Sequence, residues 1–243
     1  MKNLKVFLLF IVSLLLVYSL KAQTVDEIID KYADALGGRA NVTALKATKT
    51  IGSISMMGMD FPFTLYAIYP DKSYLEVSVQ GMLMKQGFDG TSGWSVNPMT
   101  GSSSPEKVDD ETAKSFKVRA KIISPLITYK EDGAKVELLE NTKLNGKDVF
   151  KIKYTNSDND VTTYYVDAEN YLVVRSDKKV KQMGKELDSE TSYSNFRKVG
   201  EINMPFMMET KTSESKMGSQ IMILDKIEIN PTIEDAVFQM PAK

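Results

Sequence analysis

Apolar and polar residues alternate along most of the chain, and this period of two predicts β-strands. The alternation is clear where Phe61, Phe63 and Leu65 alternate with more polar positions. An Asn145-Gly146 dipeptide lies between two alternating segments and is typical of a hairpin turn between antiparallel neighbours. The predicted strands begin at Thr48 and include residues 61–69, 75–79, 82–88, a short strand at Trp94, 136–144, 149–155, 161–167, 171–180, 185–196, 204–214 and 219–230.

Two segments depart from this alternation and have helical spacing instead. Thr24 and Glu27 form a capping box at the start of a helix over residues 24–36, whose apolar residues recur on one face. A second helix with one apolar face is predicted within residues 107–123. Residues 97–105 before it are rich in Pro, Gly and Ser and are predicted to form a loop.

The number of predicted strands constrains the architecture. About eleven or twelve antiparallel strands in one sheet must curl, because a wide open sheet twists and exposes its edges. We therefore predict a mainly β fold in which a single strongly curved antiparallel sheet forms an incomplete barrel of about 11 strands. The N-terminal and inserted helices would act as a lid or plug on its concave face. The chain shows no linker and no repeat of fixed period, so residues 23–243 are predicted to form a single domain.

Residues 1–22 have the pattern of a secretory signal peptide. Lys2 and Lys5 precede an apolar run at residues 6–20, and Ala22 offers a small residue at the cleavage point. An uncleaved membrane anchor is the alternative, and no cysteine follows the run to carry a lipid. Removal of this segment leaves 28 basic and 32 acidic residues, a net charge of −4, which argues against binding to nucleic acid.

The chain contains neither histidine nor cysteine, and this limits its chemistry. The usual general base near neutral pH, the thiolate nucleophile and the preferred zinc and copper ligands are all missing. Catalytic mechanisms of the Ser-His-Asp and Cys-His types are therefore excluded. The composition favours a binding or carrier protein that is not an enzyme and needs no cofactor.

Acidic residues keep two other kinds of site under consideration. Pairs such as Glu186 with Asp188 leave a carboxylate-based hydrolase as an alternative. Residues 156–160 resemble a calcium loop but lack the EF-hand glycine and terminal glutamate, which favours a polar hairpin loop. Asp89 precedes Gly90 and is predicted to accept hydrogen bonds from the backbone of its own turn.

The chain has 14 methionines, many of them on predicted strands or turns. Flexible thioether side chains suit an adaptable apolar cavity that receives acyl chains, although methionine also fills gaps in ordinary cores. The last predicted strand is expected to place Ile221, Ile223, Ile227 and Ile229 on one face. The candidate ligand-binding residues of such a cavity are Phe61, Phe63, Leu65, Met82, Met84, Trp94, Phe116, Met204, Phe206, Met208, Ile221 and Ile223.

With these elements in order, the chain resembles the outer-membrane lipoprotein carrier (LolA/LolB-like) superfamily. The likeness is greatest to the divergent lipoprotein-sorting proteins of Bacteroidetes-type bacteria, and it covers most of the chain after the signal peptide. The motifs that carry it are Phe88-Asp89-Gly90 with Gly93-Trp94 and Asn97-Pro98, Tyr164-Tyr165-Val166-Asp167 with Tyr171-Leu172-Val173-Val174-Arg175, and Ile227-Glu228-Ile229-Asn230 with Phe238-Gln239-Met240-Pro241.

The resemblance implies an unclosed barrel with a helical lid over an apolar cavity that receives lipoprotein acyl chains in the periplasm. It also implies transfer partners in the inner and outer membranes. The family's carrier uses an arginine on the barrel wall to hold the lid shut, a role that we assign to none of Arg39, Arg119, Arg175 and Arg197.

The leading hypothesis is therefore a monomeric periplasmic carrier of lipoprotein acyl chains or a related lipid, without catalysis. One alternative is a protein-interaction module in which a partner strand pairs with the open edge of the barrel. A binder of another hydrophobic small ligand is a further alternative.

Overall fold

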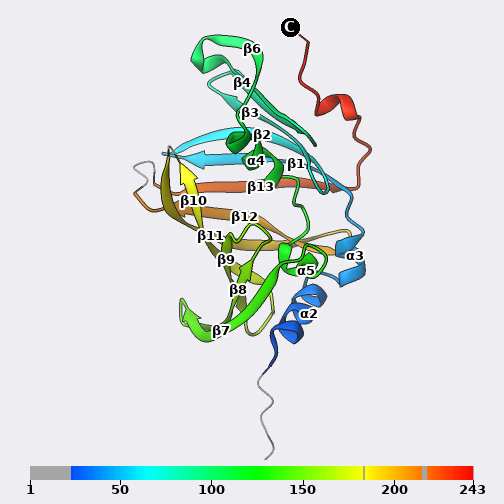
Figure 1. The fold of residues 1–243 in the computed structure, drawn as a ribbon, viewed down its shortest axis with the longest axis vertical. Helices are drawn as coiled ribbons and strands as arrows, with labels where there is room; N and C mark the ends of the chain where they lie inside the picture. The colour runs from blue at the N-terminus through cyan, green and yellow to red at the C-terminus, as the bar shows by residue number, and fades with distance from the viewer. Residues whose placement is uncertain (1–22, 183, 215–217, 243) are drawn as a thin grey trace, which may run out of the picture.

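The computed structural model describes residues 23–182, 184–214 and 218–242, and the predicted signal peptide at 1–22 lies outside the described residues. The described strands form one antiparallel sheet of thirteen strands that is not closed into a barrel (Figure 1). The predicted mainly β fold is thus confirmed. The strands are β1 (Ala47–Met56), β2 (Met59–Ile68), β3 (Lys72–Val79), β4 (Met82–Asp89), β5 (Gly93–Asn97), β6 (Ser102–Lys107), β7 (Lys135–Leu144), β8 (Lys147–Thr155), β9 (Val161–Asp167), β10 (Val173–Gln182), β11 (Lys185–Val199), β12 (Ile202–Thr212) and β13 (Gln220–Ile229).

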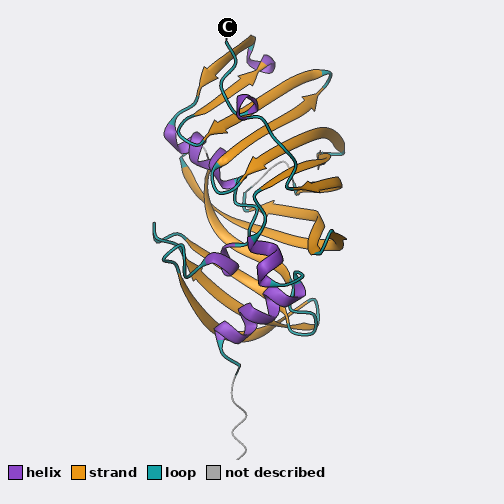
Figure 2. Cartoon of the chain, turned by 90° about the vertical axis from the view of Figure 1, so that its right-hand side faces the viewer, coloured by secondary structure: helices purple, strands orange, loops and turns teal. Residues whose placement is uncertain are grey.

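The sheet consists of two meanders joined side by side. Strands β1 to β6 follow one another across one half, and β7 to β13 follow one another across the other half. The halves meet where β1 pairs with β13, so β6 and β7 are the two edges of the described sheet. Figure 2 shows the strands following one another in a single strongly curved layer. The curvature gives the sheet a concave face, as predicted.

The sheet has more strands than the sequence predicted because β6 arises from a segment expected to be mostly loop. Part of the Pro-, Gly- and Ser-rich segment forms the short helix η1 (Pro98–Thr100), and the chain then returns to pair with β5. Pro105 lacks a backbone N–H and cannot donate to a neighbouring strand. Since β6 has a partner on one side only, the edge position tolerates this proline.

Two sets of helices lie against the concave face. In one half, Ile28, Ile29 and Tyr32 of the N-terminal helix share a buried core with Ile152 of β8 and Val166 of β9. In the other half, the inserted helix contacts β3, β4 and β5. None of the helices in the described part of the chain is long and apolar enough to cross a membrane. The described helices, besides η1, are α2 (Val25–Ala35), α3 (Arg39–Thr43), α4 (Asp110–Val118), α5 (Pro125–Thr128) and η2 (Asp235–Val237).

The predicted capping box at the start of α2 is confirmed. The Oγ1 atom of Thr24 accepts a hydrogen bond from the Glu27 backbone at 3.2 Å, and the Glu27 carboxylate accepts one from the Thr24 backbone at 3.0 Å. Replacing Thr24 with alanine is expected to lower the free energy of unfolding by about 1 kcal/mol in urea denaturation. Thr24→Ser keeps the hydroxyl and should retain most of this stability, so equal losses in both variants would contradict the prediction.

Candidate functional site on the concave face

An apolar surface lies in the middle of the concave face, between the two helical covers. Phe63, Phe206 and Leu224 are buried at its centre, and the surrounding side chains are only partly buried. Strand register places these residues on one face, because Phe63 lies across from Gly52 and Gly52 lies across from Leu224. We call this surface the apolar patch. Its members are Phe63, Phe206, Leu224, Ile54, Leu65, Leu75, Val77, Val199, Met204, Met208, Met222 and Ile227.

A β-bulge in β13 decides which residues of that strand face the patch. The register of β1 and β13 shifts between the pairs Ile51–Lys226 and Gly52–Leu224, which leaves one extra residue in β13. The extra residue inverts the alternation, so Met222 lies on the same face as Ile227. The predicted single face of four isoleucines is therefore wrong, because a bulge changes the parity that a uniform period of two assumes.

The bulge removes two predicted ligand-binding residues from the concave face. Ile221 and Ile223 pair across from Ser55 and Ser53, on the opposite face of the sheet from the patch. The side chain of Ile223 is 39% exposed on that opposite face. The sequence offers no direct signal of the bulge, since both faces of β13 carry apolar residues.

Apart from Trp94, the remaining predicted residues fall into three groups. Five of them are in the apolar patch: Phe63, Leu65, Met204, Phe206 and Met208. Alternation places Phe61, Met84 and Met82 on the same face but closer to the hairpin tips, where Met82 is already exposed. Phe116 belongs to α4 and is buried with Phe88 between that helix and the sheet.

Trp94 was predicted to line the ligand-binding cavity, but the structure places it elsewhere. It pairs across from Gly87, whose strand neighbour Phe88 faces α4, so the indole lies on the other face of the sheet. There its Nε1 atom donates a hydrogen bond of 2.7 Å to the backbone oxygen of Phe238. Trp94 therefore anchors the C-terminal segment, and it does not face the patch.

Next to the patch, a cleft of about 1660 Å³ opens between α4 and strands β8 to β12. Its apolar and aromatic part includes Tyr154, Tyr164, Tyr193 and Ile123, and its rim carries charged residues of both signs. Tyr193 pairs across from Met208, so the cleft continues into the patch along the concave face. None of the predicted ligand-binding residues lines this cleft. The sequence-based prediction of the binding site contained no tyrosine, because it was built mainly on methionines and phenylalanines. The alternation in the strand at 161–167 is the signal that could have placed Tyr164 on the concave face.

The tyrosines of the cleft are neutral at physiological pH. Burial raises the pKa of Tyr164 and of Tyr193, and it raises the pKa of the adjacent Tyr32 to about 12. The hydroxyl of Tyr193 forms a 2.9 Å hydrogen bond with Ser176. These rings therefore present apolar area with a few uncharged hydroxyls, which suits an amphipathic ligand.

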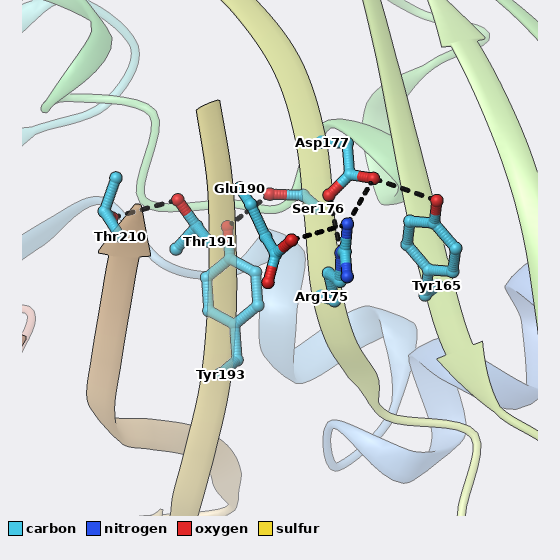
Figure 3. A network of polar contacts seen from close by, with 8 residues as sticks. All are labelled: Tyr165, Arg175, Ser176, Asp177, Glu190, Thr191, Tyr193 and Thr210. Carbon is cyan, nitrogen blue, oxygen red and sulfur yellow. Dashed lines mark hydrogen bonds and ion pairs between the residues drawn. The ribbon is translucent and has the colours of Figure 1, made fainter. Parts of the chain in front are cut away.

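Two arginines are held by ion pairs. Arg175 lies 2.7 Å from Asp177 and 2.6 Å from Glu190, and its guanidinium stacks on Tyr165 (Figure 3). Register places these side chains on the opposite face of the sheet from Ser176, and the carboxylates that pair with Arg175 lie on β10 and β11, not on a helix. The raised pKa of Arg175 results first from its hydrogen bonding to Asp177.

Arg39 instead connects the helices of the N-terminal cover. Its Nη1 atom donates to the backbone oxygen of Ile127 at 2.7 Å, and its Nη2 atom pairs with Asp30 of α2 at 2.9 Å. Asp26 of α2 further contacts Tyr129 and Lys130 after α5. The hydrogen bond from Tyr129 and the one from Lys130 lower the pKa of Asp26. Helices α2, α3 and α5 thus form one connected cover.

The acidic candidates form local backbone contacts. The Oδ1 atom of Asp89 accepts hydrogen bonds from the backbones of Thr91 and Ser92, both at 2.8 Å, which confirms the predicted turn. Asn156 closes the 156–160 loop by accepting from the backbones of Asp158 and Asp160. Within the described residues, no group of three acidic side chains is arranged to hold a metal ion.

Comparison with known proteins identifies the fold. A profile for a family described as "Uncharacterized protein" matches residues 127–242, and no curated protein matches the sequence. A LolA superfamily protein from Nitrosomonas europaea superposes with a TM-score of 0.59 at 13% identity, over 90% of this chain and 98% of that one. A DUF1329 family protein from Desulfovibrio piger gives a TM-score of 0.58 at 14% identity over the same shares.

A third similar structure is a domain described as that of an outer membrane lipoprotein-sorting protein, from Vibrio parahaemolyticus. Its TM-score is 0.57 at 11% identity, over 87% of this chain and 94% of that domain. These likenesses establish that the chain has the LolA-like fold, as the sequence motifs predicted.

Proposed function

We propose that this protein is a carrier that binds acyl chains, of lipoproteins or of a related lipid, on the apolar patch without catalysing a reaction. The single observation that carries the proposal is the position of the patch. Partly exposed apolar side chains lie in the middle of a concave face, between two helical covers that leave them accessible. Large apolar surfaces exposed in this way are typical of binding sites.

The chemistry of the patch supports an acyl chain as the ligand. Its open part is formed by thioether and aliphatic side chains, including Met204, Met208 and Met222, which adapt to chains of varying shape. Each buried methylene of a ligand contributes about 0.8 kcal/mol, so a long chain binds well without any specific polar contact. The similar Vibrio domain is described as part of a lipoprotein-sorting protein, which agrees with this class of ligand.

The proposal also covers where the protein acts and which partners it exchanges acyl chains with. A chain with the predicted signal peptide at residues 1–22 would act in the periplasm as one domain over residues 23–243. Transfer of acyl chains between two membranes requires a donor and an acceptor, which we propose to be proteins or lipid surfaces of the inner and outer membranes. The carrier itself would act as a monomer.

Two neighbouring pairs of residues on β12 and β13 provide a test with a matched control. Met208 and Met222 pair across the strands on the patch, while Met207 and Ile223 pair one position away on the opposite face. Replacing Met208 and Met222 together with glutamine should weaken binding of cis-parinaric acid, a fluorescent fatty acid, by about tenfold, or 1.4 kcal/mol. Polar amides placed there would have to be desolvated by the acyl chain.

The control variant replaces Met207 and Ile223 with glutamine and should bind the probe as the wild type does. Both measurements are fluorescence titrations on the chain without residues 1–22. Failure of the wild type to bind the probe would overturn the carrier proposal. Equal weakening in the two double variants would show that the ligand does not lie on the concave patch.

A further inference from the structure

One arginine of this chain has a buried nitrogen that bonds to nothing. Arg119 lies at the C-terminal end of α4, and its guanidinium is 4.8 Å from the centre of the Phe116 ring beneath that helix. Its Nη1 atom is buried and has no hydrogen-bond partner. Within the described part of the chain, only one other buried side-chain nitrogen or oxygen is unpartnered, the Oε1 atom of Gln86.

The unpartnered charge of Arg119 sets it apart from the other arginines. Arg39 and Arg175 pair with carboxylates, and Arg197 donates to Asn195. Burial alone lowers the pKa of Arg119 to about 10, with no contribution from an acidic neighbour. The guanidinium is therefore still positive at neutral pH. A buried charged donor without a partner is costly, and an anion that reached it would remove that cost.

The two residues that carry these atoms both adjoin the Phe88–Phe116 cluster, on the face of the sheet that carries the apolar patch. Gln86 is two residues from Phe88 on β4 and therefore on the same face, and Phe88 packs with Phe116 beneath α4. Gln86 also pairs across from Leu75, which is a member of the patch. Arg119 reaches the same cluster through its stacking on Phe116.

We propose that Arg119, assisted by Gln86, binds the anionic head group of an acidic lipid whose acyl chain lies on the apolar patch. This inference rests on the proposed carrier function and names the class of its ligand. A guanidinium matches the paired oxygens of a carboxylate or a phosphate. The amide of Gln86 can turn about its terminal bond and donate its NH₂ group to the same head group.

The test compares a charged and an uncharged probe with the same chain. Wild-type protein should bind cis-parinaric acid about tenfold more tightly than its methyl ester, because only the acid offers an anion to Arg119. In Arg119→Gln the acid should bind as weakly as the ester, while binding of the ester stays unchanged. Arg119→Lys keeps the charge and should restore part of the preference.

The matched control is Arg197→Gln. Arg197 also stacks on an aromatic ring, 4.7 Å from Phe206, but its side chain is exposed and already donates to Asn195. This variant should keep the preference for the acid. Its loss in Arg197→Gln and not in Arg119→Gln would overturn the assignment to Arg119. Equal binding of acid and ester by the wild type would overturn the anionic site and leave the carrier function standing, whereas no binding of either probe would overturn both.

A second readout separates head-group binding from a structural role. Arg119→Gln loses the contact with the Phe116 ring but removes a buried charge whose Nη1 atom has no hydrogen bond to lose, so the melting temperature of the lipid-free protein should stay close to that of the wild type. A clear decrease would assign Arg119 to stability and contradict the proposal.

Displacement of the bound cis-parinaric acid by palmitate or by lysophosphatidic acid then shows whether the preferred head group is a carboxylate or a phosphate. Inorganic phosphate alone should not displace it, since it lacks the acyl chain.

Discussion

Replacing Trp94 with alanine should lower the free energy of unfolding by about 3–5 kcal/mol, the largest loss that we expect from any single substitution in this chain. The indole is 2% exposed, and its ring centre lies 5.9 Å from that of Tyr74. Its close neighbour across the strands is Gly87, where a Cβ atom would lie 2.4 Å from the indole. Deleting the ring would leave a cavity that the rigid sheet cannot fill.

The same substitution should also free the C-terminal segment. Phe238 is fully buried, and its backbone oxygen accepts the 2.7 Å hydrogen bond from Trp94 Nε1. Outside this contact, the segment is held by an ion pair of 2.8 Å between Asp235 and Lys72. Limited proteolysis of Trp94→Ala should therefore cut near Phe238 at protease concentrations that leave the wild type intact.

The substitution Trp94→Phe distinguishes packing from hydrogen bonding. It keeps most of the ring but removes the donor, so a loss of about 1–3 kcal/mol is expected from the unpaired Phe238 oxygen. Urea denaturation measures both variants. If Trp94→Ala unfolds at the same urea concentration as the wild type, the indole does not hold the segment.

The sequence predicted features that depend on local patterns. Thr24 and Glu27 identify the start of α2 because a capping box is a contact between residues three apart. Asn145-Gly146 identifies a hairpin because both residues adopt positive φ in the turn, 51° and 83°. Such signals depend only on residues close together in the sequence, and for this reason the structure confirms them.

Features that depend on pairing with distant strands could not be predicted in this way. The bulge of β13 depends on the pairing of this strand with β1. Because of the bulge, Met222 lies on the concave face and Ile223 lies on the opposite face. The assignment of Trp94 to the cavity failed for a similar reason, since its partner Phe238 is 144 residues away. Arg119 gave no sequence signal either, because an arginine without a partner is recognised only when its surroundings are known.

Replacing Gly52 with alanine should lower the free energy of unfolding by about 2–3 kcal/mol through overpacking at the bulge. Gly52 pairs with Leu224 at the point where the register shifts. A Cβ atom there would lie 2.2 Å from the backbone oxygen of Ile223 and 3.1 Å from the Cα atom of Leu224. These are backbone atoms, so β1 and β13 would have to separate. The two halves of the sheet meet at this pair of strands.

Because the bulge presents Met222 and Leu224 to the patch, Gly52→Ala should also weaken binding of the methyl ester of cis-parinaric acid.

The matched control is Gly58→Ala in the turn between β1 and β2. A Cβ atom at Gly58 would have nothing within 4 Å, but its φ of +76° disfavours alanine, so a loss of about 1 kcal/mol is expected. Urea denaturation and probe titration on both variants give the result. Equal losses of stability would contradict the prediction, because Gly52, unlike Gly58, has no positive φ and its extra cost must come from the close approach at the bulge. Unchanged ester binding in Gly52→Ala would show that the bulge does not shape the ligand surface.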